Sequence, residues 1–226
     1  MTELSRSGDV FVLRIDAGEN RFGPDVLRSW NQALDEVEAA EGPKALVTTG
    51  AGKFYSNGLD LDYMMSCDDA PAYLEGVLHV MARILVFPTY TVAALNGHAF
   101  GAGAQIALAH DVRVMRVDRG YFCMPEVDMK APLHPGMTAI IQARLPHQSA
   151  HEVIVTGTRY GGDLAVDRRI VDEVAPEEEV VPRAVALAAP YAAKAHAVMG
   201  KLKRDMYTHV LEALATEFAD SPDESR

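Results

Sequence analysis

The chain has 226 residues, of which 49 % are apolar and 23 % are charged, so it is long enough for one sizeable globular domain. Its formal net charge of −11 argues against a surface that binds nucleic acid or an anionic membrane. No run of about 18 apolar residues is present, and a membrane-spanning helix is therefore not expected.

The ends of the chain and its cysteines bear on its location. The first ten residues contain no apolar core of a signal peptide, and the last residues, "SPDESR", are not a peroxisomal address. Cys67 and Cys123 form no spacing motif and are interpreted as free thiols in a reducing compartment. We expect a cytoplasmic protein.

Strands and helices are predicted to alternate along the first half of the chain. β-branched residues predict strands over 9–16, 44–50 and 91–97. Apolar residues at helical spacing predict helices over 24–42, with proline at its first turn, and over 71–87, which stops before Pro88. This alternation indicates an α/β fold.

The second half begins with a glycine-rich turn. A helix follows this turn within 96–112, and short strands are predicted over 111–116 and 121–124. From about residue 137 onward the pattern is mostly helical.

Two segments share one order of strand, glycine, loop, small residues and helix. They are "KALVTTGAGKFYSNGLDLDYM" (44–64) and "TVAALNGHAFGAGAQIALAH" (91–110). Each loop leads to a helix N-terminus, whose first backbone N–H groups lack intrahelical partners and attract negative charge. The glycines can clear space for an oxyanion, or they can serve only close packing of helix on strand. The pattern alone leaves both interpretations open.

Three stretches carry a resemblance to a known family. They are "GKFYSNGLDL" (52–61), "NGHAFGAGAQIALAHDVRVMRVDRGYF" (96–122) and "MPEVDM" (124–129). Together they resemble the enoyl-CoA hydratase/isomerase (crotonase) superfamily, and most closely its Δ3,Δ2-enoyl-CoA isomerases, over residues 8–215. The resemblance implies a spiral of ββα repeats with the CoA site in 1–150. A helical oligomerisation region would follow in 151–226, within one continuous unit.

The resemblance also implies a set of site residues. The backbone N–H groups of Leu59 and Ala102 correspond to the family's two donors to the thioester oxygen, and Glu126 corresponds to a catalytic carboxylate. Hydratases have a second glutamate early in the glycine-loop helix, and this chain has Gln105 there.

Substrate contacts are implied by the same comparison. The residues expected to contact the acyl-CoA thioester are Ser56, Gly58, Leu59, Asp60, Leu61 and Ala102. The late basic cluster Lys201, Lys203 and Arg204 is a candidate for the CoA phosphates, although a solvated helix face is the simpler interpretation. No separate cofactor and no metal are expected, because coenzyme A is part of the substrate.

The amide at position 105 bears on the type of reaction. Hydration needs a water to be activated and a proton to be delivered, and two carboxylates share this task, whereas Gln105 cannot exchange a proton at neutral pH. Moving a double bond from the 3- to the 2-position needs only one base and stabilisation of a dienolate. The sequence therefore favours an isomerase. A hydratase or another crotonase-type enzyme is the alternative, and a non-catalytic acyl-CoA-binding member is the second.

Histidines outside the motifs give weaker signals. His134 lies eight residues after Glu126, an offset at which dienoyl-CoA isomerases carry an acidic residue, so it is a possible auxiliary acid/base. An exposed loop histidine is the favoured alternative. His147 and His151 have i,i+4 spacing but no evident third ligand, and are interpreted as surface residues. A homotrimer or dimer of trimers is expected, with no nucleic-acid or membrane partner.

Overall fold

A computed structural model describes residues 2–217 of the chain. The strands of these residues are β1 (Glu3–Ser7), β2 (Val10–Ile15), β3 (Ala45–Gly50), β4 (Phe54–Ser56), β5 (Tyr90–Leu95), β6 (His98–Phe100), β7 (Val112–Arg116), β8 (Phe122–Cys123) and β9 (Glu173–Ala175). The helices are α1 (Pro24–Ala39), α2 (Leu61–Ser66), α3 (Ala70–Leu85), α4 (Ala102–Ala109), α5 (Glu126–Met129), α6 (Pro135–Arg144), α7 (His147–Thr156), α8 (Gly162–Asp167), α9 (Val180–Ala188), α10 (Ala197–Met206) and α11 (Thr208–Leu214). Two 3₁₀ segments, η1 (Glu177–Glu179) and η2 (Ala189–Lys194), flank α9.

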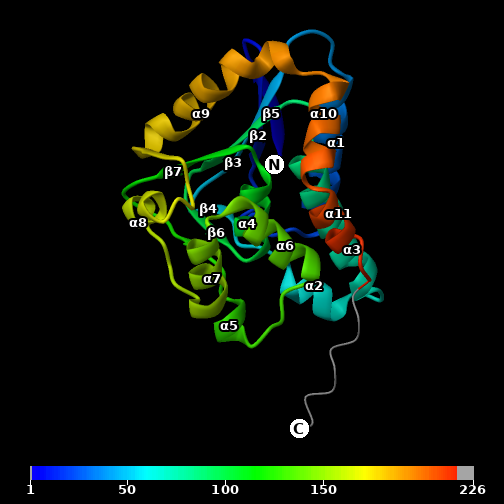
Figure 1. The fold of residues 1–226 in the computed structure, drawn as a ribbon, viewed down its shortest axis with the longest axis vertical. Helices are drawn as coiled ribbons and strands as arrows, with labels where there is room; N and C mark the ends of the chain where they lie inside the picture. The colour runs from blue at the N-terminus through cyan, green and yellow to red at the C-terminus, as the bar shows by residue number, and fades with distance from the viewer. Residues whose placement is uncertain (1, 218–226) are drawn as a thin grey trace.

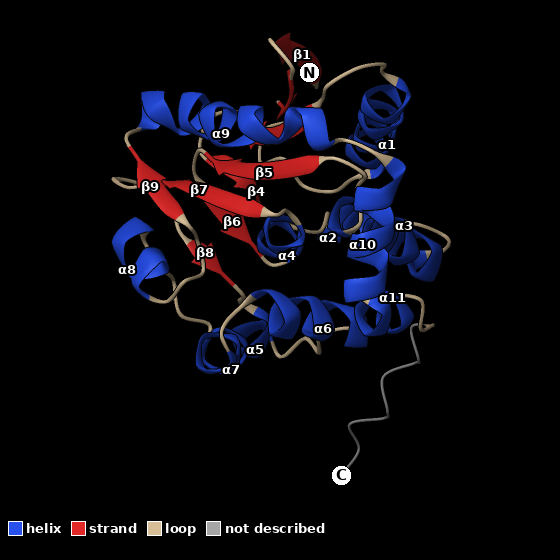
Figure 2. Ribbon diagram, turned by 45° about the horizontal axis from the view of Figure 1, so that its top comes forward, coloured by secondary structure: helices blue, strands red, loops and turns tan. Residues whose placement is uncertain are grey.

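A strand–strand–helix unit occurs three times in succession: β3-β4-α2, β5-β6-α4 and β7-β8-α5. The first strand of each unit lies in a six-stranded sheet of order β1-β2-β3-β5-β7-β9, and the second lies in a three-stranded sheet, β4-β6-β8. Figure 2 shows these two layers of strands and the helices around them. This architecture confirms the predicted α/β fold of the crotonase type and adds a third unit to the two expected.

The large sheet is covered on both faces. On one face, valines of β3, β5 and β7 pack with small apolar residues of α9, which crosses that face (Figure 2). On the other face lies the main core, formed with the small sheet and α1, α3 and α4. Because β3 is buried along its whole length, it reads as a continuous apolar and threonine run rather than an alternating one.

Four strands were not expected from the sequence: β1, β4, β6 and β9. β1 is a polar and mostly exposed strand that pairs antiparallel with β2 at the sheet edge, so it lacks the apolar alternation of a half-buried strand. β9 has only three residues and pairs parallel with β7 within a region predicted to be mostly helical. Its position is fixed by the sheet edge and not by its own sequence pattern.

The segment after residue 150 completes the core. The predicted boundary at 150 falls inside α7, and both β9 and α9 beyond it belong to the large sheet and its cover. Farther on, α10 and α11 lie beside α1 and α3 on one side of the molecule (Figure 1). Over its described residues, 151–217, the predicted C-terminal region is thus helical for the most part and continuous with the rest of the fold. Its last residues, 218–226, lie outside the described residues.

None of the helices described between residues 2 and 217 is long and apolar enough to cross a membrane.

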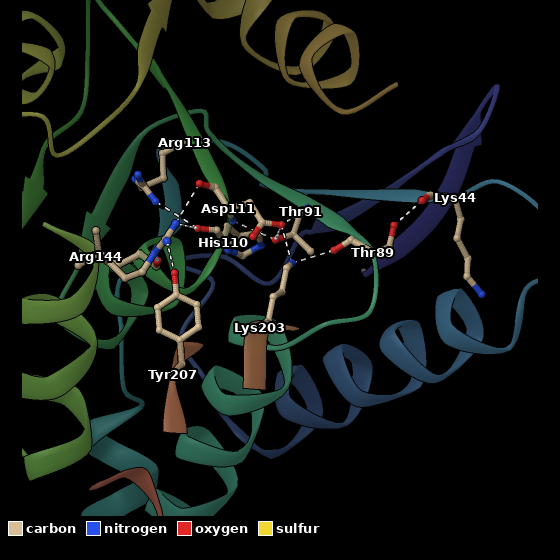
Figure 3. Close-up of polar contacts among 10 residues, drawn as sticks. Lys44, Thr89, Thr91, His110, Asp111, Arg113, Arg144, Lys203 and Tyr207 are labelled. Carbon is tan, nitrogen blue, oxygen red and sulfur yellow. Dashed lines mark hydrogen bonds and ion pairs between the residues drawn. The ribbon is translucent and has the colours of Figure 1, made fainter. Parts of the chain in front are cut away.

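A buried ion pair attaches α10 to the large sheet. Lys203 is 8 % exposed, and its Nζ lies 2.6 Å from Asp111 Oδ2 and donates to the carbonyl of Thr89 at 2.9 Å (Figure 3). Asp111 Oδ2 also accepts from the backbone N–H of Thr91 at 2.9 Å. Lys203 is therefore buried and paired, and the suggestion that it contacts a CoA phosphate is wrong for this residue.

Removing this lysine is expected to cost much stability. Lys203→Met would leave the partly buried Asp111 carboxylate without its cation, and loss of one partner of a buried pair lowers the free energy of unfolding by about 3–5 kcal/mol. Lys201→Met is the matched control, because Lys201 pairs with Asp205 on the exposed surface of the same helix and contributes less than about 0.5 kcal/mol. Urea unfolding of both variants measures the difference. Equal midpoints would show that the buried pair contributes nothing.

Candidate active site

The two glycine-containing loops meet in the structure. β4 pairs parallel with β6, which places the loop after β4 beside the loop after β6. A Cβ built on Gly58 would lie 3.2 Å from the backbone nitrogen of Ala102 and 2.8 Å from the carbonyl oxygen of Phe100. A Cβ on Gly103 would lie 2.4 Å from the carbonyl oxygen of Ser56. The two loops therefore face each other, and their glycines serve close packing.

The second loop delivers a helix N-terminus to this junction. Gly101 has φ +51° and is the N-cap of α4, so the chain turns sharply before the first helical residue, Ala102. The first N–H groups of a helix have no intrahelical acceptor and carry partial positive charge. The Ala102 N–H, next to the Gly58–Leu59 loop, is thereby placed to bind negative charge. Close packing and anion binding are compatible at this site.

The opposite end of α4 is held by two arginines (Figure 3). Arg144 donates to the carbonyl oxygens of Leu108 at 2.9 Å, His110 at 2.6 Å and Asp111 at 2.9 Å. Arg113 donates to the same His110 carbonyl at 3.2 Å. These cations satisfy carbonyl groups at the negative end of the helix and complement its dipole. They fix the axial position of α4 and thus of its N-terminus at the loop junction.

A series of buried hydrogen bonds connects the C-terminal end of α4 to β3. His110 Nδ1 lies 2.8 Å from the carbonyl oxygen of Ile106, and its Nε2 lies 2.9 Å from Thr48 Oγ1. Thr48 in turn bonds the Tyr55 hydroxyl at 2.8 Å. Burial lowers the pKa of His110 to about 3, so the ring is neutral and Nδ1–H donates to Ile106. The histidine serves structure rather than proton transfer.

Glu126 begins α5 and points toward the second loop. Pairing of β6 with β8 brings its segment beside Gly101, and a Cβ on Gly101 would lie 3.5 Å from Glu126 Oε1. Gln105 Nε2 donates to that same oxygen at 3.2 Å. The Glu126 carboxylate is therefore directed at the start of α4 and not at bulk solvent.

The neutral form of this carboxyl group is favoured more strongly in the protein than it would be in water. Burial raises the pKa of Glu126, and its own backbone N–H and the hydrogen bond from Gln105 oppose this shift in part. Among the described residues, Glu126 Oε2 and Gln105 Oε1 are buried side-chain atoms without a hydrogen-bond partner. Unpartnered buried polar atoms are costly, and they mark a place where a ligand or a water completes the site.

The residues expected to contact the substrate have different surroundings. Ser56 is buried, and its Oγ donates to the carbonyl of Asn20 at 2.7 Å and accepts from the Gly58 N–H at 3.2 Å. This serine shapes the loop. Asp60 caps α2 by accepting from the Tyr63 N–H at 3.2 Å. Leu61 is the first residue of α2, and Leu59, two residues earlier, is packed against the main core.

A groove adjoins the first loop. It encloses about 680 Å³ and is lined by Ala17, Glu19, Arg21, Gly23, Pro24, Asp25, Val26, Asp60, Asp62, Tyr63 and Ser66. Arg21 bridges Glu19 at 2.7 Å and Asp62 at 3.1 Å, which links the segment before α1 to α2. The sequence prediction named only Asp60 of this groove.

Asn20 is a site-shaping residue that the sequence prediction missed. It has φ +53°, accepts from the Ala17 N–H at 2.8 Å and donates to the Phe54 carbonyl at 2.8 Å. Asparagine tolerates this left-handed conformation better than other non-glycine residues. The only sequence signal is an asparagine between a strand and a proline-started helix, which is common in ordinary turns.

His134 is buried, and not an exposed loop residue as favoured from the sequence. Only 5 % of it is exposed, and it caps α6 by accepting from the Gly136 N–H at 3.1 Å. Its Nε2 lies 3.1 Å from the carbonyl oxygen of Thr216, just after α11. These contacts give His134 a structural role between two helices. A role in proton transfer stays a prediction.

The paired histidines do not form a metal cluster in the described part of the chain. His147 and His151 line a groove between α6 and α7 with Thr138, Gln142, Ala150, Ile154 and Val155. No group of three or more His, Cys, Asp or Glu residues within 2–217 is arranged to hold a metal ion.

Comparison with known proteins identifies relatives of this chain. A family model described as enoyl-CoA hydratase/isomerase matches residues 6–222. The chain is 33 % identical to peroxisomal enoyl-CoA delta isomerase 2 of Arabidopsis thaliana, with 96 % of both chains covered. It is 34 % identical to enoyl-CoA delta isomerase 3 of the same plant, covering 96 % of this chain and 93 % of that one. The crystal structure of a probable enoyl-CoA hydratase from Mycobacterium tuberculosis H37Rv superimposes with a TM-score of 0.87 at 26 % identity, covering 94 % of this chain and 91 % of that one.

Proposed function

The chain belongs to the enoyl-CoA hydratase/isomerase family, and we propose that it is a Δ3,Δ2-enoyl-CoA isomerase with Glu126 as its single acid/base. The observation that carries this proposal is the pairing of one carboxylate with one amide at the loop junction. A hydratase of this family is expected to place a second carboxylate where Gln105 stands. An uncharged amide can orient a group but cannot exchange a proton at neutral pH.

The proposed reaction uses one base twice. Glu126 removes a proton from C2 of a 3-enoyl thioester, and the electron pair of the broken C–H bond delocalises into a dienolate. Negative charge then collects on the thioester oxygen, which the N–H groups of Leu59 and Ala102 would stabilise. The protonated Glu126 returns its proton to C4, and the double bond is left between C2 and C3. No atom is gained or lost, so no water and no separate cofactor take part.

The electrostatics of the site support this role for Glu126. An acid/base that both takes and returns a proton works best when its pKa is closer to the working pH than that of an exposed carboxyl. Burial raises the pKa of Glu126 in that direction. The dienolate charge is expected at the N-terminus of α4, which carries partial positive charge. Arg144 and Arg113 donate to carbonyl oxygens at the other end of this helix and complement its dipole.

Two other functions lead to different outcomes. A hydratase would need a second acid/base in addition to Glu126, with His134 as the first candidate. A non-catalytic acyl-CoA-binding protein would need neither the raised pKa of Glu126 nor its direction toward α4. Self-association as a trimer or dimer of trimers and a cytoplasmic location stay predictions.

Product analysis separates these functions. Purified protein is incubated with a 3-enoyl-CoA and, separately, with a 2-enoyl-CoA, and the products are resolved by chromatography and mass. We expect conversion of the 3-enoyl to the 2-enoyl thioester without a change in mass. Faster addition of water to the 2-enoyl thioester would overturn the isomerase assignment. Binding of both thioesters without turnover would favour the non-catalytic alternative.

A further inference from the structure

The two carboxylate oxygens of Glu126 differ in their hydrogen-bond partners. Gln105 Nε2 donates to Glu126 Oε1 at 3.2 Å. Glu126 Oε2 is buried, and no partner for it is found among the described residues. One oxygen is therefore held by Gln105, and the other has no partner within residues 2–217 and is available to a bound substrate.

We propose that Gln105 is a positioning residue that holds Oε1 of Glu126, so that Oε2 is the oxygen that takes the proton from C2 and returns it to C4. The inference rests on the proposed isomerase function. In each half of the cycle one bond at Oε2 forms or breaks. The O–H bond forms as the C2–H bond breaks, and it breaks as the C4–H bond forms, while Oε1 keeps its hydrogen bond.

The chemistry of the two groups fixes the orientation of the amide. An ionised carboxylate only accepts hydrogen bonds, whereas an amide has two N–H donors and one acceptor oxygen. Turning the amide over would place its oxygen against a carboxylate oxygen, and two acceptors would then face each other. The donor orientation is therefore the one that matches an ionised base, which is the form that must meet the substrate.

One helix connects this contact to the place where charge develops. Ala102 and Gln105 are three residues apart on α4, and residues at this spacing share a face of a helix. Gln105 is completely buried, and its backbone N–H bonds the carbonyl of Gly101 at 3.0 Å. The N–H at the start of α4 and the amide that holds the base therefore belong to one rigid turn. This turn sets the distance between the base and the dienolate oxygen.

The pH dependence of turnover tests the proposal. Gln105→Met keeps an unbranched side chain of similar length but removes the donor. The hydrogen bond from Gln105 lowers the pKa of Glu126, so its loss raises that pKa, and the acid limb of the kcat profile moves to higher pH. We expect kcat on the plateau to fall by about tenfold, because the carboxylate is no longer oriented. KM is expected to change less than about twofold.

The matched control is Gln32→Met, which removes an exposed amide from α1 and is expected to leave the profile unchanged. A second readout needs no substrate: NMR titration of protein labelled with ¹³C at the glutamate carboxyls, with the Glu126 resonance assigned by its absence in Glu126→Gln. This titration is expected to move to higher pH in Gln105→Met. Gln105→Ala is measured in the same way in case the methionine variant does not fold.

The outcomes separate this inference from the function on which it rests. If wild-type protein does not isomerise 3-enoyl-CoA, the proposed function is wrong, and the NMR titration still reports whether Gln105 holds Glu126. If wild type isomerises but the acid limb and the carboxyl titration do not move in the Gln105 variants, the inference is overturned. A lower kcat with both titrations unchanged would also overturn it, because loss of packing alone has that effect.

Discussion

Glu126→Gln is expected to lower kcat for 3-enoyl-CoA isomerisation by about 10²–10⁴-fold, the usual range for loss of a positioned acid/base. The substitution keeps the size of the side chain and its ability to accept from Gln105. It removes the negative charge and the capacity to take up a proton. Affinity for acyl-CoA is therefore expected to change little, and the loss falls on kcat rather than on KM. Steady-state kinetics with a 3-enoyl-CoA and a separate binding titration provide the measurement.

The same substitution lowers kcat but is not expected to lower the stability of the fold. Because burial raises the pKa of Glu126 above its unfolded value, the folded state binds the proton more tightly than the unfolded state does. Ionisation at neutral pH therefore costs folding free energy, and this cost disappears when the side chain is a neutral amide. Glu126→Gln should unfold at a temperature no lower than wild type at pH 7. Exposed Glu36 on α1 provides the control, since Glu36→Gln should change neither kcat nor stability. Unchanged turnover in Glu126→Gln would remove Glu126 from the mechanism.

Most of the fold could be predicted from the sequence because its central elements are locally consistent. The helices over 24–42 and 71–87 have apolar residues on one face and proline at or next to one end, and they correspond to α1 and α3 within three residues at each end. β2, β3 and β5 are rich in β-branched residues and are bounded by turn residues. β1, β6 and β9 are instead strands because a neighbouring strand pairs with them. Such tertiary pairing leaves little trace in a short sequence.

The site could be located from the sequence but its contacts could not. The glycine loops and Glu126 stand in a recognisable order, so their meeting could be expected. The hydrogen bond from Gln105 to Glu126 joins residues 21 positions apart on α4 and α5, and its existence depends on the register of β6 with β8. The burial of Lys203 depends in a similar way on where α10 docks. Side-chain type predicts which chemistry is possible, whereas packing decides which partner is present.

Gly58→Ala is expected to lower kcat by about 10²–10³-fold, as when a donor to the developing oxyanion is lost. A methyl group on Gly58 would meet the carbonyl oxygen of Phe100 at 2.8 Å and the backbone nitrogen of Ala102 at 3.2 Å. Both are backbone atoms and cannot be relieved by a change of rotamer, so the two loops must move apart. The N–H groups of Leu59 and Ala102 would then no longer converge on one oxygen. Since the proposed donors are backbone groups, a clash between the loops tests them where deletion of a side chain cannot.

The backbone conformation of Gly58 requires a control of its own. Its φ of +83° makes any alanine there strained, and strain alone costs about 1–2 kcal/mol of stability. Gly52 has a similar φ of +67°, but a Cβ built on it would contact nothing within 4 Å. Gly52→Ala should therefore lose the stability that this strain costs but keep wild-type kcat. Gly58→Ala should lose stability and also have a lower kcat. If the two variants melt alike and turn over 3-enoyl-CoA alike, the junction of the loops does not stabilise the transition state. The glycines would then serve packing alone, the second of the two roles that the sequence left open.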